Sequence, residues 1–345
     1  MLTYVYLRDY QKFRGRDIKE IIKAHSKGWS LSDYKILKVN KSNQKQFLST
    51  RDYCSMHPFN GEFSAWIDDK LTLKYLLYGT SLGSLMPRYY MMIDENGCII
   101  PLPDVKHIEP NVNLEASDVL EICKRESTLA VKKIKGSIGD GFIKMSYDSE
   151  HRNYLFNNKS YTPKEAEDFL YKMRNYLIME YLSPHKDFIK FSPDSVGCLR
   201  YQLGRTKNGE LKDLFAFLRI GTQKSGYVEN YNSGGILTYI DLITGEYDGG
   251  NELDQSTYQN HKILYHPDSN IRLKGKIPNW DKLKSLAHAI AAYMPQLKYI
   301  GIDFCITDDG IRMIEINSLT SLDSFQLELP VFNSSYASFF KERLS

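Results

Sequence analysis

The sequence lacks most of the features that assign a protein to a class at first sight. Its five cysteines are scattered and form no CxxC pair, which argues against a disulfide framework or a zinc cluster and favours a reducing compartment. We therefore expect a cytoplasmic protein. No apolar run reaches 18 residues, so we expect no transmembrane segment. The N-terminus reaches charged residues too early for a signal peptide.

Familiar catalytic patterns and strong charge are missing as well. There is no GxSxG, no GxGxxG and no Cys–His pair in a recognisable context, and the histidines lack metal-ligand spacing. The net charge of +3 is too small to indicate a nucleic-acid partner, so we expect none. With 42% apolar and 25% charged residues, the 345-residue chain has an ordinary globular composition and the length for two or three subdomains.

The most informative segment is 299–317, where two β-rich runs flank an Asp-Asp-Gly sequence. We expect a hairpin with a three-residue loop, in which Gly310 takes the left-handed conformation. The register then pairs Thr307 with Ile311, Cys305 with Met313, and Asp303 with Glu315. Because side chains alternate along a strand, Asp303, Glu315 and Asn317 share one face of the hairpin.

Two opposed carboxylates repel each other unless a positive group lies between them. Together with the amide oxygen of Asn317, Asp303 and Glu315 form a hard oxygen site of the kind that Mg²⁺ accepts, completed by phosphate oxygens and water. The alternative is an exposed hairpin whose acidic side chains face water.

A second pattern lies in residues 132–141, where a strand delivers Lys132 into a loop of glycines and Ser137. Glycines let backbone N–H groups approach phosphate oxygens, and a lysine neutralises phosphate charge. The segment is not a P-loop, because the lysine precedes the loop and a strand follows it. The alternative is a glycine hairpin with solvated lysines.

A third pattern is the hairpin expected around Asn208-Gly209, the strongest short hairpin signal. A two-residue loop pairs Cys198 with Arg219 and places Arg219 diagonal to Arg200 on one face of the sheet. Two like charges on one face repel unless an anion lies between them. The alternative is a pair of exposed arginines on the outer face.

These patterns occur in an order that resembles the ATP-grasp superfamily. The order is a helix with Lys70 and Lys74 on one face, a lysine with a glycine loop, a strand with an acceptor at its end, arginine-bearing strands and an acidic hairpin. The resemblance is closer to the sugar-transfer-associated branch, which is related to α-L-glutamate ligases and to teichuronopeptide-biosynthesis proteins. It runs from about Trp66 to Phe325. Gly197 and Cys198 depart from it, standing where the family has Asn-Thr.

The resemblance implies an α+β fold in which two α+β lobes clamp ATP, preceded by a small N-terminal α/β region. We expect a helical or mixed N-terminal segment of unknown role at 1–65 and a pre-ATP-grasp region at 66–116. A small lobe with the glycine loop follows at 117–182. A large lobe with the metal site and the substrate strands occupies 183–345.

The resemblance also implies roles for individual residues. Lys132 would contact the phosphates, with Lys74, or alternatively Lys70, as the second lysine on the phosphate side. The flap over the phosphates would contain Gly136, Ser137, Gly139 and Gly141. Glu180 and the backbone of Leu182 would read adenine, and Asp187 would reach the ribose. Asp303, Glu315 and Asn317 would hold one or two Mg²⁺ ions, which Mn²⁺ could replace. Arg200, supported by Arg219, would stabilise the transferred phosphoryl group, and the substrate loop would contain Asn230, Gly234 and Gly235.

The activity implied is that of an ATP- and Mg²⁺-dependent carboxylate–amine ligase acting through an acyl-phosphate. The resemblance points to an amino acid as the amine and to a uronic acid, or another carboxylate of a cell-surface glycan or its precursor, as the acceptor. It also implies an association with glycan-assembly enzymes. A non-catalytic ATP-binding module in glycan assembly and a sugar kinase remain as alternatives.

Overall fold

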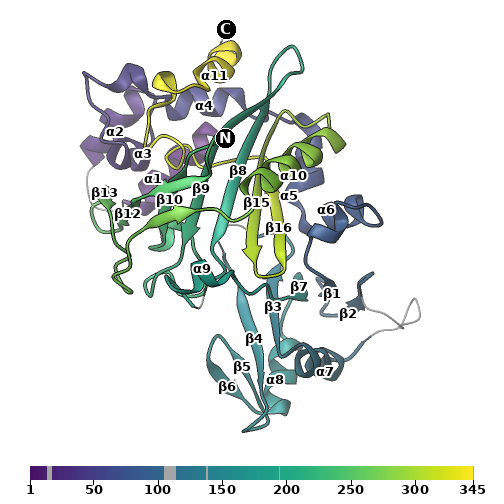
Figure 1. The fold of residues 1–345 in the computed structure, drawn as a ribbon. Helices are drawn as coiled ribbons and strands as arrows, with labels where there is room; N and C mark the ends of the chain where they lie inside the picture. The colour runs from purple at the N-terminus through teal and green to yellow at the C-terminus, as the bar shows by residue number, and fades with distance from the viewer. Residues whose placement is uncertain (14–17, 105–113, 137–138, 194, 345) are drawn as a thin grey trace.

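The computed structural model describes residues 1–13, 18–104, 114–136, 139–193 and 195–344. They form an α+β protein with two seven-stranded sheets and a small two-stranded sheet. In Figure 1 the seven-stranded sheet that contains β3 to β6 lies at the bottom with α7 and α8, and the seven-stranded sheet that contains β8 to β10, β15 and β16 lies above it with the N-terminal helices beside it. The pairings between the named strands of the described residues are antiparallel.

The small lobe is a sheet in the order β2-β1-β7-β3-β4-β5-β6. Its strands are β1 (Tyr89–Ile93), β2 (Ile99–Pro101), β3 (Thr128–Lys133), β4 (Ile143–Asp148), β5 (Asn153–Phe156), β6 (Lys159–Tyr161) and β7 (Tyr176–Glu180). Helices α7 (Ala116–Glu126) and α8 (Pro163–Leu170) bury their apolar residues against it in one core. Thr162 and Glu165 form a capping box at the start of α8, which satisfies two N-terminal amides. Strands β1 and β2 come from the predicted region 66–116, and β3 to β7 come from the predicted region 117–182. The two regions therefore share one sheet.

The large lobe is a sheet in the order β13-β12-β10-β9-β8-β15-β16. Its strands are β8 (Cys198–Arg205), β9 (Leu211–Ile220), β10 (Ile236–Ile240), β12 (Gly250–Asp254), β13 (Gln259–Ile263), β15 (Tyr299–Thr307) and β16 (Gly310–Asn317). Helix α10 (Trp280–Tyr293) packs its apolar face against the sheet in the largest hydrophobic core. The two-stranded sheet joins β11 (Glu246–Asp248) to β14 (Lys274–Lys276).

The N-terminal segment is helical and packs on the large lobe. It contains α1 (Leu2–Lys12), α2 (Ile18–Ser26), α3 (Leu31–Ile36) and α4 (Thr50–Met56). Residues 1–13 and 18–65 thus contain helices, in line with the helical or mixed segment predicted there, but no strand of the predicted α/β region. Its core continues into Phe215, Phe325 and Phe339. Asn60 Oδ1 accepts the Tyr299 N–H at 2.9 Å while Asn60 Nδ2 donates to the Tyr299 carbonyl at 2.8 Å. The segment is thereby tied to the start of β15.

The remaining helices are short and lie at the edges of the two lobes. They are α5 (Ala65–Asp68), α6 (Lys70–Leu77), α9 (Lys186–Ile189) and α11 (Ala337–Leu344). Across the described ranges, the helices all fall short of the length and apolar character that a membrane crossing requires.

The acidic hairpin has a shorter turn than the sequence predicts. β15 ends at Thr307 and β16 begins at Gly310, so the loop has two residues instead of three. Thr307 pairs with Gly310 instead of Ile311, and Cys305 pairs with Arg312 instead of Met313. Ile314 then forms a β-bulge, which shifts the register by one residue and returns Asp303 to its predicted place opposite Glu315.

The hairpin of β8 and β9 shows the same kind of compensation. Its loop has three residues instead of two, because the Thr206 N–H donates to the Glu210 carbonyl at 2.9 Å. Leu214 forms a bulge that corrects the register farther from the turn. Cys198 therefore pairs with Arg219, as predicted.

Candidate functional site

A cavity lies between the two lobes and is lined by both. The small lobe contributes β3, the glycine loop and the end of β7, and the large lobe contributes β8, β9, the loop 227–230 and the acidic hairpin. The residues predicted from the sequence that line it are Lys132, Gly136, Gly139, Glu180, Leu182, Arg219, Asn230, Asp303 and Glu315, joined by Lys70. The structure thus brings most of the predicted site into one place.

Other predicted residues lie outside the lining. These are Lys74, Gly141, Asp187, Arg200, Gly234, Gly235 and Asn317, and Ser137 is outside the described residues. Arg200 and Asn317 contact lining residues directly, whereas Asp187 is exposed on α9 and pairs with His185 at 3.4 Å. Asn230 Oδ1 accepts the Asn232 N–H at 2.8 Å, so this side chain also caps a turn of the substrate loop.

Asp303 lies buried between two arginines. Arg200 approaches it through Nε and Nη2, with Nη2 2.8 Å from Oδ2, and Arg219 Nη2 also lies 2.8 Å from Oδ2. The three residues meet because β9, β8 and β15 are neighbours in the sheet. Burial alone would raise the pKa of Asp303, but the two positive charges outweigh it and hold the pKa at about 2. The anion expected between the arginines is therefore a carboxylate of the chain itself.

Arg219 has further contacts at the cavity wall. Its Nη2 lies 2.8 Å from Cys198 Sγ and 3.8 Å from Glu229 Oε1. Its Nε is buried and has no hydrogen-bond partner within the described part of the chain. Burial raises the pKa of the Cys198 thiol, so this side chain is neutral. A buried guanidinium N–H without a partner is unusual, because buried polar groups are nearly always hydrogen-bonded.

The acidic hairpin supplies oxygen donors that suit Mg²⁺ in kind. Asn317 Nδ2 lies 3.4 Å from Asp303 Oδ2 and 3.4 Å from Glu315 Oε1, so the three side chains converge. Carboxylate and amide oxygens are ligands that Mg²⁺ prefers. Because both Asp303 oxygens face arginines, Glu315 and Asn317 are the better placed donors. In the described ranges, no three His, Cys, Asp or Glu side chains gather as a metal site.

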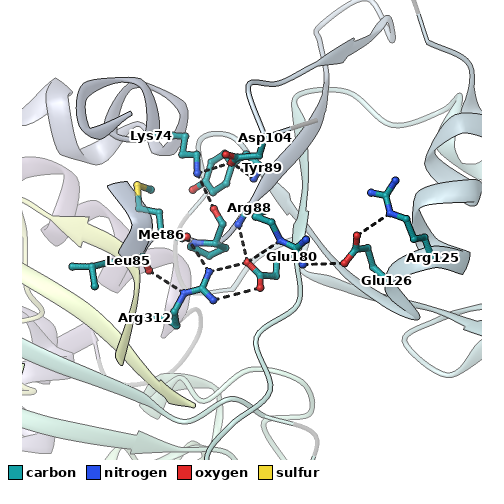
Figure 2. Close-up of polar contacts among 11 residues, drawn as sticks. Lys74, Leu85, Met86, Arg88, Tyr89, Asp104, Arg125, Glu126, Glu180 and Arg312 are labelled. Atoms are coloured by element: carbon teal, nitrogen blue, oxygen red, sulfur yellow. Dashed lines mark hydrogen bonds and ion pairs between the residues drawn. The ribbon is translucent and has the colours of Figure 1, made fainter. Parts of the chain in front are cut away.

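The two lysines of α6 have different surroundings. Lys70 Nζ lies 3.2 Å from Glu315 Oε2 and donates to the Gly136 carbonyl at 3.0 Å, which links the glycine loop to the acidic hairpin. Lys74 Nζ is buried 2.6 Å from Asp104 Oδ2 and donates to the Pro87 carbonyl at 3.0 Å (Figure 2). This arrangement favours Lys70 over Lys74 for the phosphate side.

Two further lysines follow on β3. Lys132 Nζ lies 5.6 Å from the centre of the Phe142 ring. Lys133 Nζ pairs with Asp140 Oδ2 at 2.7 Å, near the rim of the cavity. Both residues line the cavity, so β3 presents two positive charges beside the glycine loop.

The end of β7 also lines the cavity. Glu180 Oε2 accepts the Arg88 N–H at 2.9 Å and lies 2.8 Å from Arg312 Nη2 (Figure 2). Burial opposes ionisation here, but the hydrogen bonds and charges of the two arginines outweigh it and lower the pKa of Glu180. The sequence analysis missed Arg312, because its partner Glu180 is distant in the chain and only the strand arrangement brings the two together.

Comparison with known proteins gives one family. The sugar-transfer-associated ATP-grasp family matches residues 52–332. Among solved structures, D-alanyl-alanine synthetase A from Vibrio cholerae O1 biovar eltor is 14% identical, with 82% of this chain and 65% of that chain covered and a TM-score of 0.44. N5-carboxyaminoimidazole synthetase from Staphylococcus aureus is 11% identical, with 74% and 45% covered and a TM-score of 0.38. The chain thus spans between about half and two thirds of these proteins. No curated protein sequence matches it.

Proposed function

The chain belongs to the sugar-transfer-associated ATP-grasp family, and we propose that it is an ATP- and Mg²⁺-dependent ligase that joins a carboxylate to an amine. The main support is the cavity between the lobes, where lysines and a glycine loop face an arginine and an acidic hairpin. Phosphoryl transfer requires such an arrangement, because catalysis rests on positioning and on neutralising phosphate charge.

The proposed reaction has two steps. A carboxylate oxygen attacks the γ-phosphorus of ATP, the bond to the β-phosphate oxygen breaks, and ADP leaves an acyl-phosphate behind. The amine nitrogen then attacks the acyl carbon, the bond from carbon to the phosphate oxygen breaks, and the nitrogen loses a proton as the amide forms. Glu315 and Asn317 would hold Mg²⁺, which would supply positive charge to offset that of the phosphates.

The residues of the chain would divide this work by position. Lys70 and Lys132 would neutralise the phosphates, and the loop with Gly136 and Gly139 would cover them and exclude water that would hydrolyse the acyl-phosphate. Arg219 has a spare N–H for the transferred phosphoryl group. Arg200 would hold Asp303, and through it Arg219, in place.

The proposed substrates rest on the family resemblance and not on the geometry. A uronic acid, or a related carboxylate of a cell-surface glycan precursor, is the proposed acceptor, and an amino acid is the proposed amine. The positive charge of the arginine pair suits a carboxylate that becomes an acyl-phosphate. Glycan-assembly enzymes are the proposed partners.

The proposal is tested by ADP release with Mg²⁺ and ATP against uronic acids and amino acids, each alone and in pairs. We expect release that requires both an acid and an amine, with an amide product found by mass spectrometry. Release with an acid or sugar alone and a stable phosphorylated product would indicate a kinase instead. Tight ATP binding without release for any pair would favour a binding module.

Lys70 and Lys74 provide a paired prediction, because they lie one turn apart on the same helix. Replacing Lys70 by methionine removes a charge at the cavity and is expected to raise the KM for ATP about tenfold. Replacing Lys74 leaves Asp104 without its buried cation, so it is expected to lower the unfolding temperature while the KM for ATP changes less than about twofold. Steady-state kinetics and thermal unfolding of both variants measure the contrast. A larger rise in KM for Lys74→Met than for Lys70→Met would reverse the assignment.

A further inference from the structure

Arg312 and Glu180 form an ion pair that joins the two lobes at the edge of the cavity (Figure 2). Arg312 belongs to β16 of the large lobe, and Glu180 is the last residue of β7 in the small lobe. Arg312 Nη2 lies 2.8 Å from Glu180 Oε2, and Arg312 Nη1 lies 3.4 Å from Oε1. Two contacts side by side fix the relative orientation of the planar guanidinium and carboxylate groups.

The same guanidinium also holds the segment that leads into β1. Arg312 Nη2 donates to the Met86 carbonyl at 3.0 Å, and Nε donates to the Leu85 carbonyl at 3.3 Å. Glu180 in turn accepts the backbone N–H of Arg88 at 2.9 Å. The segment 85–88, β7 and β16 therefore meet at one ion pair, which we call the interlobe clamp.

The interlobe clamp borders the cavity through Glu180. Glu180, Tyr181 and Leu182 line the cavity, and so does Glu315. Arg312 and Glu315 pair with Cys305 and Asp303, which are two residues apart on β15, so at a rise of about 3.3 Å per residue they are separated by roughly 7 Å along the sheet. Strand β16 thus carries both Arg312 of the clamp and Glu315, which we place at the phosphate side of the cavity.

We propose that Arg312 is a positioning residue for nucleotide binding, which fixes Glu180 and the backbone of residues 181–182 where the base is read. This inference rests on the function proposed above. Glu180 Oε2 is already shared by the Arg312 guanidinium and the Arg88 amide. Oε2 of Glu180 therefore serves the clamp, which leaves Oε1 and the backbone groups at the end of β7 to read the base.

Arg312→Gln in the full chain tests this role through nucleotide affinity. Titration with a fluorescent N-methylanthraniloyl-ADP is expected to show binding weakened about tenfold, because small displacements of a binding edge are costly. At saturating ATP, the kcat for ADP formation is expected to stay within about threefold, since the clamp lies away from the transferred phosphate. Arg312→Lys keeps the charge but loses the two-pronged contact, and a smaller loss of affinity is expected.

Arg272→Gln is the matched control. Arg272 also contacts one aspartate through Nη2, with Asp248 oxygens at 3.0 and 3.3 Å, but this pair is exposed and lies outside the cavity lining. We expect unchanged nucleotide affinity. Thermal unfolding of every variant shows whether a loss of affinity accompanies a loss of folding.

A double variant distinguishes a positioning role through Glu180 from an unrelated loss of nucleotide affinity. If Arg312 acts through Glu180, the variant Arg312→Gln/Glu180→Gln binds the fluorescent nucleotide about as weakly as the weaker single variant. The inference is wrong if the two losses multiply, or if both Arg312→Gln and Arg312→Lys bind like the wild type. Wild-type protein that binds no nucleotide would instead overturn the proposed function, and the clamp would then have no nucleotide to position.

Discussion

Replacing Asp303 by asparagine is expected to lower the free energy of unfolding at neutral pH by about 3–5 kcal/mol. The side chain is 1% exposed and holds two guanidinium groups. Asparagine keeps the shape but removes the charge, so Arg200 and Arg219 would be left facing each other without an anion. Chemical denaturation followed by circular dichroism measures the loss.

The loss of unfolding free energy in Asp303→Asn is expected to be largest at neutral pH and to become smaller as the pH falls. The pKa of Asp303 is about 2 in the folded protein and near 3.9 when unfolded. A lowered pKa contributes stability that is present above the unfolded value and lost as pH falls through the folded one. This contribution, on the order of 2–3 kcal/mol, is therefore full above about pH 5 and fades towards pH 2. The difference between wild type and Asp303→Asn should shrink over this range.

Asp248→Asn is the matched control for this prediction. Asp248 also has two cationic partners, Arg272 and Lys274, at 3.0 Å each, but its side chain is 44% exposed. Exposed ion pairs contribute at most about 1 kcal/mol, so little change is expected. Equal losses for Asp303→Asn and Asp248→Asn would mean that burial between the arginines does not determine the stability of this site.

The two hairpins show how far strand registers can be predicted from the sequence. The pairings of Asp303 with Glu315 and of Cys198 with Arg219 were predicted correctly, because alternation and the turn residues fix the approximate register. Both turn lengths were wrong by one residue, and a bulge compensated each error. A bulge depends on packing against neighbouring strands and has no reliable local signature, so the sequence could not place it.

The arginine pair shows a different limit. Charge repulsion indicated an anion between Arg200 and Arg219 as one of two alternatives; the structure has Asp303 there, and that identity depends on the strand order. β15 lies next to β8 although about a hundred residues separate Asp303 from Arg200. The choice between Lys74 and Lys70 as the second phosphate-side lysine, which the sequence left open, meets a related limit. Helical spacing places both on one face, whereas only tertiary structure shows which one reaches the cavity.

Replacing Glu315 by glutamine is expected to reduce the rate of ADP formation about 10²–10³-fold. Glu315 lies at the cavity, contacts Lys70 and is the best placed carboxylate for Mg²⁺. Losing its charge weakens the neutralisation of phosphate oxygens while the amide keeps the size of the side chain. Binding of the fluorescent ADP analogue without metal is expected to change less than about threefold, because the base end is untouched. Kinetics at varied Mg²⁺ concentration would show a higher metal requirement.

Glu252→Gln is the control for the loss of a similar ion pair. Glu252 is on β12 of the same sheet, is 21% exposed against 25% for Glu315, and pairs with Lys224 at 2.9 Å. It lies outside the cavity lining, so ADP formation should stay within about twofold of wild type. If Glu315→Gln formed ADP at the wild-type rate, Glu315 could not be a metal ligand, and the acidic hairpin would have only a structural role. Normal metal dependence with a slower rate would instead assign Glu315 to holding Lys70 beside the phosphates.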